Sequence, residues 1–397
     1  MPLYYTPMPT SLKLLPLITF TLLALFLPLS VSADTVISSP IASSTTWTLS
    51  GSPYIIDSSF SVLVGVTLTI EPGVVVKAKI TGLEGPNIRG TLVARGTITA
   101  PIIFTSMNDN EVGEWQGLYF KEGSVGDFDH VILRYSGYGG YGYGNFVGIE
   151  NDGGKLHIQN AHIHDNSKII SNGAGGFMTV GAGIYNKGEL TVDNSTISNH
   201  LYGIFSESGT TTLAYNIFQN NSGQGIDMRG PEPLTLLNNA FVGNKKTAYV
   251  DPSKLFIHHG NTSSDLTNKG FDMSGIARDG ATFHSDDLPI ILAGGSLVVP
   301  PFTTLTLAPG VIIKLGSYPR VGSITIQGAL NSLGTKEKPV HFTSLKDDSV
   351  GGDTNGDATT TSPAAKDWNA IYLENGSKAD FNHSVIRYGG FNYNGEY

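Results

Sequence analysis

The chain has 397 residues, no cysteine, 49 glycines and a formal net charge of −9, and only 14% of its residues are charged. This length exceeds that of one ordinary compact domain but suits a repeat protein, which has no single growing core. The lack of cysteine excludes a disulfide framework and thiolate metal sites. The acidic balance, without any cluster of lysine and arginine, argues against nucleic-acid binding, because a phosphate backbone needs a basic surface.

Residues 1–33 are predicted to be a signal peptide. Lys13 is the only charge among them, an apolar stretch with two prolines covers residues 14–29, and Val31-Ser32-Ala33 resembles a cleavage site. The alternative is an uncleaved membrane anchor, but the stretch is short for a span and proline interrupts it. We therefore expect a secreted or cell-surface protein with no membrane span in the mature chain.

The following residues lack helical periodicity and contain short runs rich in Val, Ile, Leu, Thr and Phe, bounded by Gly, Asn or Asp. In the middle of the chain these runs are in register. Leu156, Ile158 and Ile163 match Leu190, Val192 and Ile197; the pairs Val192/Ile197, Leu213/Phe218 and Leu236/Phe241 then follow at offsets of 21 and 23. A second phrase alternates with the first, at Gly148-Ile149, Gly183-Ile184, Gly203-Ile204 and Gly225-Ile226.

Two strand signals in each period of about 22 residues predict one coil of a parallel β-helix, whose coils stack about 4.8 Å apart. One longer step fits a coil with an insertion, the Gly/Ala-rich segment 171–181. Asparagines suit the turns, where they tolerate left-handed geometry; the candidates are Asn166, Asn199, Asn220, Asn221 and Asn244. The alternative, a β-sandwich of hairpins, needs strands spaced 8–12 residues apart and predicts no such register.

Phrases from the first half return in the same order in the second. The pairs are 67–77 with 304–314, 101–106 with 339–344, and 127–135 with 380–388. We predict two related modules, residues 34–280 and residues 281–397. The second is apparently truncated, because Tyr397 corresponds to a position after which the first module continues, so the expectation is a fragment of a longer protein or a chain completed by a partner.

The repeated phrases resemble those of the right-handed parallel β-helix proteins of the pectate-lyase-like superfamily, bacterial secreted and surface members above all. The resemblance covers residues 45–397, and the phrases that carry it are 68–77, 90–97, 101–106, 115–119 and 190–199. It implies an all-β right-handed parallel β-helix, a solenoid. It does not imply one chemistry, because the scaffold hosts lyases, hydrolases, epimerases and inert adhesins.

An acidic segment is the strongest candidate site. The interval from the Phe-Thr-Ser phrase to the next Trp is 368 − 344 = 24 residues in the second module and 115 − 106 = 9 in the first, so 15 residues are inserted. The insertion carries oxygen ligands suited to Ca²⁺: Asp347, Asp348, Asp353, Asn355 and Asp357. The segment is not an EF-hand, since Ala358 occupies the position of the required Gly. The alternative is a solvated polar loop.

The aromatic-glycine segment 135–146 is a candidate ligand-binding region. Exposed rings with polar tips suit sugars or a protein partner, and an arginine can neutralise a uronate; the residues are Arg134, Tyr135, Tyr138, Tyr141 and Tyr143. In the alternative, the tyrosines fold back over the coil surface. The recurrence of His130 and Arg134 at His383 and Arg387 fits a structural ladder equally well.

No complete catalytic constellation of the superfamily is present in the sequence, and we name no catalytic residue. Of a polygalacturonase-like set only Asp286-Asp287 occurs; of a pectate-lyase-like set, Asp165, Asp193 and Asp227 occur without an evident basic partner. His157, His162 and His164 cluster beside Asp165. His162 and His164 share a strand face and can bind a metal or move protons, although surface histidines often do neither.

The expected function is therefore that of an exported, non-catalytic scaffold for adhesion or polysaccharide contact, with Ca²⁺ as the candidate cofactor and a polysaccharide or surface glycan as the candidate partner. The alternative is a lyase or glycoside hydrolase that acts on an acidic polysaccharide. A groove in which carboxylates meet an Arg or Lys favours the enzyme.

Overall fold

The computed structural model describes residues 34–56, 60–79, 86–137, 146–166, 181–285, 287–316 and 322–391. The predicted signal peptide, most of the predicted insertion at 171–181, and Tyr138, Tyr141 and Tyr143 lie outside these residues. Within them, the one helical element is a 3-10 turn, η1 (Leu49–Gly51), and no helix is long and apolar enough to cross a membrane.

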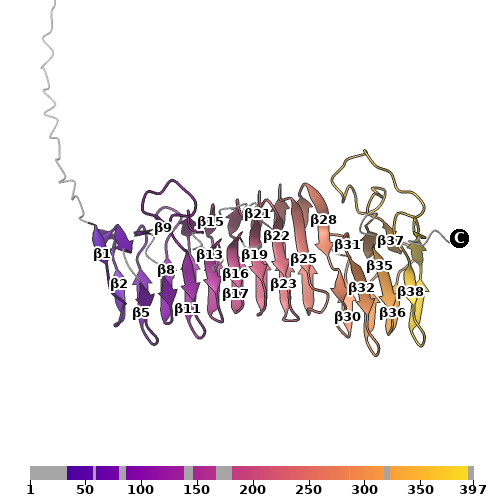
Figure 1. Ribbon diagram of the computed structural model, residues 1–397, viewed down its shortest axis with the longest axis horizontal. Helices are drawn as coiled ribbons and strands as arrows, with labels where there is room; N and C mark the ends of the chain where they lie inside the picture. The colour runs from indigo at the N-terminus through magenta and orange to yellow at the C-terminus, as the bar shows by residue number, and fades with distance from the viewer. Residues whose placement is uncertain are drawn as a thin grey trace, which may run out of the picture. The chain divides into compact units, whose positions relative to one another are not determined.

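The longest sheet has thirteen parallel strands among the described residues (Figure 1). Its strands are β4 (Ser61–Val62), β7 (Asn87–Ile88), β10 (Leu118–Phe120), β13 (Phe146–Asn151), β16 (Gly181–Asn186), β19 (Tyr202–Ser206), β22 (Gln224–Met228), β25 (Lys246–Val250), β28 (Thr267–Asp272), β31 (Ile290–Leu292), β34 (Ile312–Leu315), β37 (Val340–Ser344) and β40 (Ser384–Ile386).

Two further parallel sheets complete the first part of the solenoid. The ten-stranded sheet consists of β1 (Thr35–Ile37), β3 (Tyr54–Ile56), β6 (Val75–Ala78), β9 (Ile102–Ser106), β12 (Val131–Arg134), β15 (His162–His164), β18 (Thr196–Ser198), β21 (Ile217–Gln219), β24 (Ala240–Val242) and β27 (Thr262–Ser264). The nine-stranded sheet consists of β2 (Thr45–Trp47), β5 (Thr67–Ile70), β8 (Thr91–Arg95), β11 (Val125–Asp129), β14 (Lys155–Gln159), β17 (Glu189–Asp193), β20 (Thr211–Ala214), β23 (Leu234–Leu237) and β26 (Phe256–His259).

Two four-stranded sheets replace them later in the chain. One contains β29 (Gly275–Ile276), β32 (Ser296–Val299), β35 (Ser323–Ile326) and β38 (Ile371–Leu373). The other contains β30 (Ala281–Phe283), β33 (Thr304–Leu307), β36 (Ala329–Leu333) and β39 (Lys378–Asn382). Each coil of the solenoid therefore contributes one strand to each of three sheets.

The predicted register is confirmed residue by residue. Val192 pairs with Leu213 and then Leu213 with Leu236; Ile197, Phe218 and Phe241 pair likewise, as do the isoleucines of the four Gly-Ile phrases. The number of strands in a coil differs from the two signals that we predicted. Leu213 and Phe218, taken as one phrase, lie on β20 and β21, because the chain turns a corner at Tyr215, whose φ is 57°.

The core follows from side chains that alternate along each strand and stack from coil to coil. On β17, Leu190 and Val192 are fully buried and their neighbours are not. Phe218 and Phe241 stack with ring centroids 5.1 Å apart. The Gly-Ile phrases allow close approach, because a Cβ added to Gly203 would lie 2.4 Å from the carbonyl oxygen of Gly225.

Buried asparagines form two ladders at the corners of the coils. In the ladder between the nine- and ten-stranded sheets, the backbone N–H of each member donates to the side-chain oxygen of the next coil; the members are Ser195, Asn216, Asn239, Asn261 and Asp287. The other ladder runs through Asn221, Asn244 and Asp265. Of the predicted turn asparagines, Asn199 and Asn220 have positive φ, whereas Asn166, Asn221 and Asn244 are buried.

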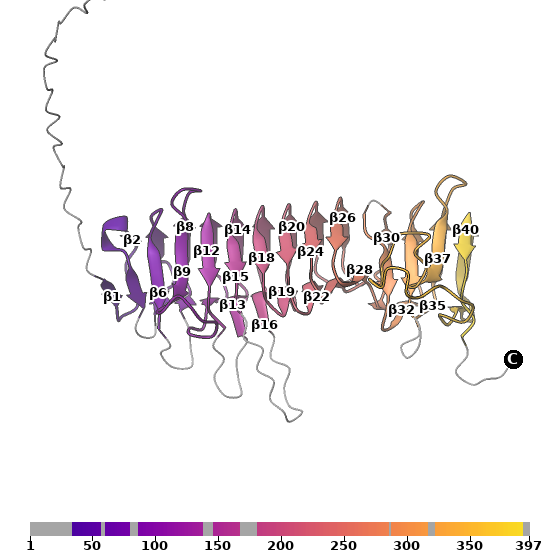
Figure 2. The ribbon, with the colours of Figure 1, turned by 90° about the horizontal axis from the view of Figure 1, so that it is seen from above.

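Two of the three sheets are interrupted between residues 264 and 275, while the thirteen-stranded sheet continues through β28. Corresponding phrases occupy different sheets on the two sides of this junction: β6 and β9 belong to the ten-stranded sheet, but their counterparts β34 and β37 belong to the thirteen-stranded one. In Figure 2, β32 and β35 lie on the same side of the solenoid as β13, β16 and β19. The module boundary at residue 280 stays a prediction.

Candidate functional site

The loop inserted after β37 packs back onto the junction. The backbone N–H of Lys269, on β28, donates to the carbonyl oxygen of Thr354 at 2.9 Å. Gly356 has a φ of 77°, and a Cβ there would lie 1.7 Å from the carbonyl oxygen of Leu266. This close backbone contact requires glycine and fixes the loop across β28 and β37 (Figure 1).

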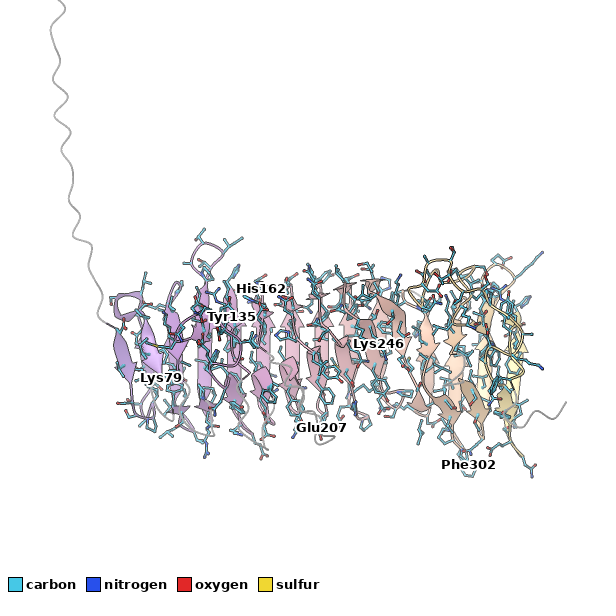
Figure 3. The ribbon with its side chains drawn as sticks, turned by 45° about the horizontal axis from the view of Figure 1, so that its top comes forward. Lys79, Tyr135, His162, Glu207, Lys246 and Phe302 are labelled. Atoms are coloured by element: carbon cyan, nitrogen blue, oxygen red, sulfur yellow. The ribbon has the colours of Figure 1, made fainter. Side chains whose placement is uncertain are left out.

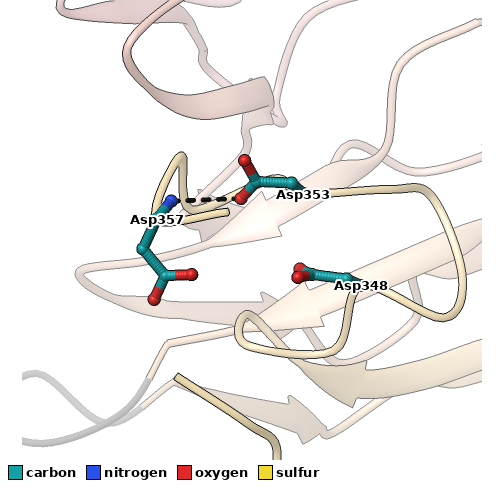
Figure 4. A group of neighbouring side chains, drawn as sticks. All are labelled: Asp348, Asp353 and Asp357. Atoms are coloured by element: carbon teal, nitrogen blue, oxygen red, sulfur yellow. Dashed lines mark hydrogen bonds between the residues drawn. The ribbon is translucent and has the colours of Figure 1, made fainter. Parts of the chain in front are cut away.

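Three of the five predicted metal ligands converge in this loop. Asp348, Asp353 and Asp357 each offer a carboxylate oxygen, and these oxygens lie within 4.8 Å of one another (Figure 4). The carboxylate of Asp353 accepts hydrogen bonds from the backbone N–H groups of Gly356 and Asp357, at 2.8 and 3.1 Å, and from Lys269 Nζ at 3.1 Å. The turn therefore orients Asp353 toward the other two acids.

The electrostatics of this acidic cluster fit a cation. The Oδ1 atoms of Asp348 and Asp357 are buried and have no hydrogen-bond partner among the described residues. Burial and the neighbouring charge of Asp353 raise the pKa of Asp348. Burial also opposes ionisation of Asp353, but its hydrogen bonds, that from Lys269 first, lower its pKa overall. Crowded carboxylates repel, and a hard cation such as Ca²⁺ relieves that repulsion.

A buried lysine lies under the same loop. Lys314 is fully buried on β34, and its Nζ donates to the carbonyl oxygen of Gly352 at 2.6 Å. Burial lowers the pKa of Lys314 to about 8, although Asp348 and other acids oppose the shift. The ammonium group supports the loop from inside and is not accessible to a substrate.

The other two predicted ligands point elsewhere. Asn355 donates its amide to Thr361 Oγ1 at 3.2 Å. Asp347 is buried, accepts a hydrogen bond from Thr343 and pairs with Arg387. The internal repeat already indicates that Asp347 is not part of the insertion. An offset of 238 aligns Asp347 with Asp109, in the part that both modules share.

The first module contains the same arrangement around Arg134. Its Nε and second terminal nitrogen contact the two carboxylate oxygens of Asp109 at 2.7 and 2.6 Å, and Thr105 also donates to Asp109. The hydrogen bond from Arg134 is the main cause of the lowered pKa of Asp109. Tyr135 occupies a corner with a φ of 62°, and the guanidinium of Arg134 lies 5.5 Å from its ring centroid. The charge of Arg134 is thus neutralised within the fold by Asp109.

Sequence reasoning missed a row of aromatic and acidic side chains outside the main core, on the thirteen-stranded sheet. This outer aromatic row consists, strand by strand, of Tyr119, Glu150, Tyr185, Phe205, Asp227, Tyr249 and Asp272. Arg229 pairs with Asp227 at 3.0 Å, and its guanidinium lies 5.0 Å from the ring centroid of Phe205 and 6.0 Å from that of Tyr249. The sequence signal for this row is the residue that follows each Gly-Ile phrase, which is aromatic or acidic in all four phrases.

Members of the outer aromatic row differ in exposure. Tyr185 and Phe205 are buried in a small cluster separate from the main core, against which Tyr202 packs. Tyr202 and Tyr249 are half-buried, and the side chain of Arg229 is 53% exposed. Burial raises the pKa of Tyr249 to about 12, so its hydroxyl stays neutral and donates to the carbonyl oxygen of Ser274.

Comparison with known families agrees with this architecture. Residues 103–274 match the model of the right handed beta helix region, and residues 41–125 match that of the pectate-lyase like beta helix domain. Together with the parallel, three-sheet topology, these matches show the fold of a right-handed parallel β-helix, and the similarity to the pectate-lyase like domain covers residues 41–125. Searches of curated proteins and of solved structures give no match.

Proposed function

We propose that this protein is an exported, non-catalytic β-helix scaffold that contacts polysaccharide on its outer surface. The observation that carries the non-catalytic part is the pairing of the cations near the candidate sites. Five of these cations form an ion pair with a carboxylate: Arg134 with Asp109, Arg229 with Asp227, Lys269 with Asp353, Lys346 with Asp367, and Arg387 with Asp347. Lys314 is instead fully buried and donates to the carbonyl oxygen of Gly352. A base that removes a sugar proton has to be free to accept it.

The outer aromatic row supports polysaccharide contact. Tyr249 of the row and Tyr202, which packs against Phe205 of the row, present partly exposed rings, and Arg229 adds a guanidinium between neighbouring coils. Aromatic rings with polar tips combine apolar area with hydrogen bonding, which suits the apolar faces and hydroxyl groups of sugars. Strands about 4.8 Å apart repeat such contacts along an extended chain.

Retention on immobilised polysaccharides tests this contact surface. We expect wild type to be retained, and the variants Tyr202→Ala and Tyr249→Ala to be retained less because each removes a partly exposed ring. Tyr215→Phe is the control. Tyr215 is an exposed tyrosine on another face, and this substitution keeps its ring. Equal retention of all four proteins would refute the proposed surface.

We also propose that Ca²⁺ binds Asp348, Asp353 and Asp357 and fastens the inserted loop to the junction. Carboxylates with buried oxygens that lack partners are the supporting observation. Ca²⁺ prefers six to eight oxygen ligands, so backbone carbonyls or water would complete the shell. Chelation should lower the melting temperature of wild type, and Asp353→Ala combined with Asp357→Ala should abolish that shift. An unchanged melting curve on chelation would contradict the proposal.

A polysaccharide lyase remains the second candidate function, because Lys269 and three aspartates meet at one place. Lys314, whose pKa burial lowers to about 8, is fully buried there, which favours the scaffold. Incubation with pectate and alginate, with and without Ca²⁺, distinguishes the two functions. Formation of unsaturated products that Lys269→Met abolishes would establish the lyase.

A further inference from the structure

Two histidines with adjacent, tilted rings lie on the outer surface of the ten-stranded sheet. His162 and His164 are the first and last residues of β15, so their side chains point to the same face. Their ring centroids are 4.1 Å apart and their planes differ by 32° (Figure 3 labels His162). Two imidazoles at this separation can bind one metal ion together.

Asp165 fixes the tautomer of one imidazole. The Nδ1 of His164 lies 2.7 Å from Oδ2 of Asp165, so Nδ1–H donates to the carboxylate and the lone pair of Nε2 stays free. A histidine held by a carboxylate through one nitrogen is the usual support of a metal ligand. Asp165 has a φ of 55°, a conformation that positions its side chain beside His164.

His162 is also suited to coordination. It is exposed, and its Nε2 lies 3.3 Å from Ser198 Oγ on the next strand, so Nδ1 is free of that contact. The charge of Arg134, on the preceding strand, is balanced by Asp109, and the ring of Tyr135 lies 6.3 Å from that of His164.

We propose that His162 and His164 chelate a divalent transition-metal ion of the Cu²⁺, Ni²⁺ and Zn²⁺ class, with Asp165 as a positioning residue. Neutral imidazole is a preferred ligand of these ions, whereas Ca²⁺ and Mg²⁺ prefer oxygen. The site is independent of the acidic loop, which is in the other predicted module. Water would fill the remaining coordination positions of the ion.

Calorimetry with Zn²⁺ and electron paramagnetic resonance with Cu²⁺ test this site on the full chain without an added histidine tag. We expect one ion per chain and a Cu²⁺ spectrum with hyperfine coupling to two imidazole nitrogens. His164→Ala should weaken binding at least tenfold, and His162→Ala with His164→Ala should abolish it. Asp165→Asn should weaken binding about tenfold while the Cu²⁺ hyperfine coupling to two nitrogens persists, because the carboxylate no longer holds the Nδ1–H but both imidazoles remain.

His157→Ala is the matched control. His157 belongs to the same coil but lies on β14, 3.8 Å from Asp127 and 3.5 Å from Asp193. This variant should bind as wild type does. Unchanged binding by the double variant, loss of binding in His157→Ala, or no saturable binding by wild type would each overturn the proposal. Circular dichroism without metal shows that each variant is folded.

Discussion

Replacement of one ladder asparagine tests how far the coils depend on their corners. Asn239 is buried, and its Oδ1 accepts the backbone N–H of Asn216 at 3.0 Å. Its Nδ2 donates to the carbonyl oxygen of Leu213 at 2.9 Å and to Oδ1 of Asn261 at 3.0 Å. In Asn239→Ala, the N–H of Asn216 and the carbonyl of Leu213 lose these partners inside the corner.

A buried polar group without its partner costs about 1–3 kcal/mol. Two such groups, with some relief from water that enters the space of the lost amide, predict a loss of about 2–4 kcal/mol in the free energy of unfolding. Urea unfolding followed by circular dichroism measures the change, with Asn110→Ala as the control because Asn110 is exposed. A loss in Asn239→Ala no larger than about 0.5 kcal/mol, the range of neutral surface changes, would refute the reasoning.

Two further changes probe the same scaffold. Gly203→Ala should cost about 1–3 kcal/mol, measured by urea unfolding, because the new Cβ overlaps the backbone of Gly225; a neutral result would show that the coils can separate there. Burial alone would raise the pKa of Asp287, but hydrogen bonds from His258 and Asn261 lower it overall. The ionised carboxylate therefore stabilises the folded protein fully above a pH of about 4, and this stabilisation is lost as the pH falls through the lowered pKa. The urea midpoint of wild type should therefore approach that of Asp287→Asn on acidification, and a constant difference from pH of about 6 to 3 would contradict the assignment.

The sequence predicted the fold to the level of register because periodic core positions leave little freedom. Leu213 has to face Val192 and Leu236 once the coil length is known, since a shift of one residue would expose each of them. The third strand of a coil was not predictable in the same way. β21 has three residues, too few for alternation, and the corner before it is formed by Tyr215 rather than by Gly or Asn.

The site was predictable only in part because proximity across coils is not visible in a linear pattern. Asp353 and Asp357 are close in sequence and share a turn, whereas Asp348 joins them through the path of the loop. Adjacent side chains such as Asp347 and Asp348 take different directions, one toward Arg387 and one toward the cluster. The ion pair of Arg134 with Asp109 likewise depends on the turn that follows β9.

Size-exclusion chromatography with light scattering, applied to mixtures of the protein with pectate or alginate, tests the central claim most directly. The account predicts that protein co-elutes with the polymer while the molar mass of the polysaccharide itself stays constant over time. A falling polysaccharide mass would show an enzyme, and separate elution of protein and all polymers tested would contradict polysaccharide contact.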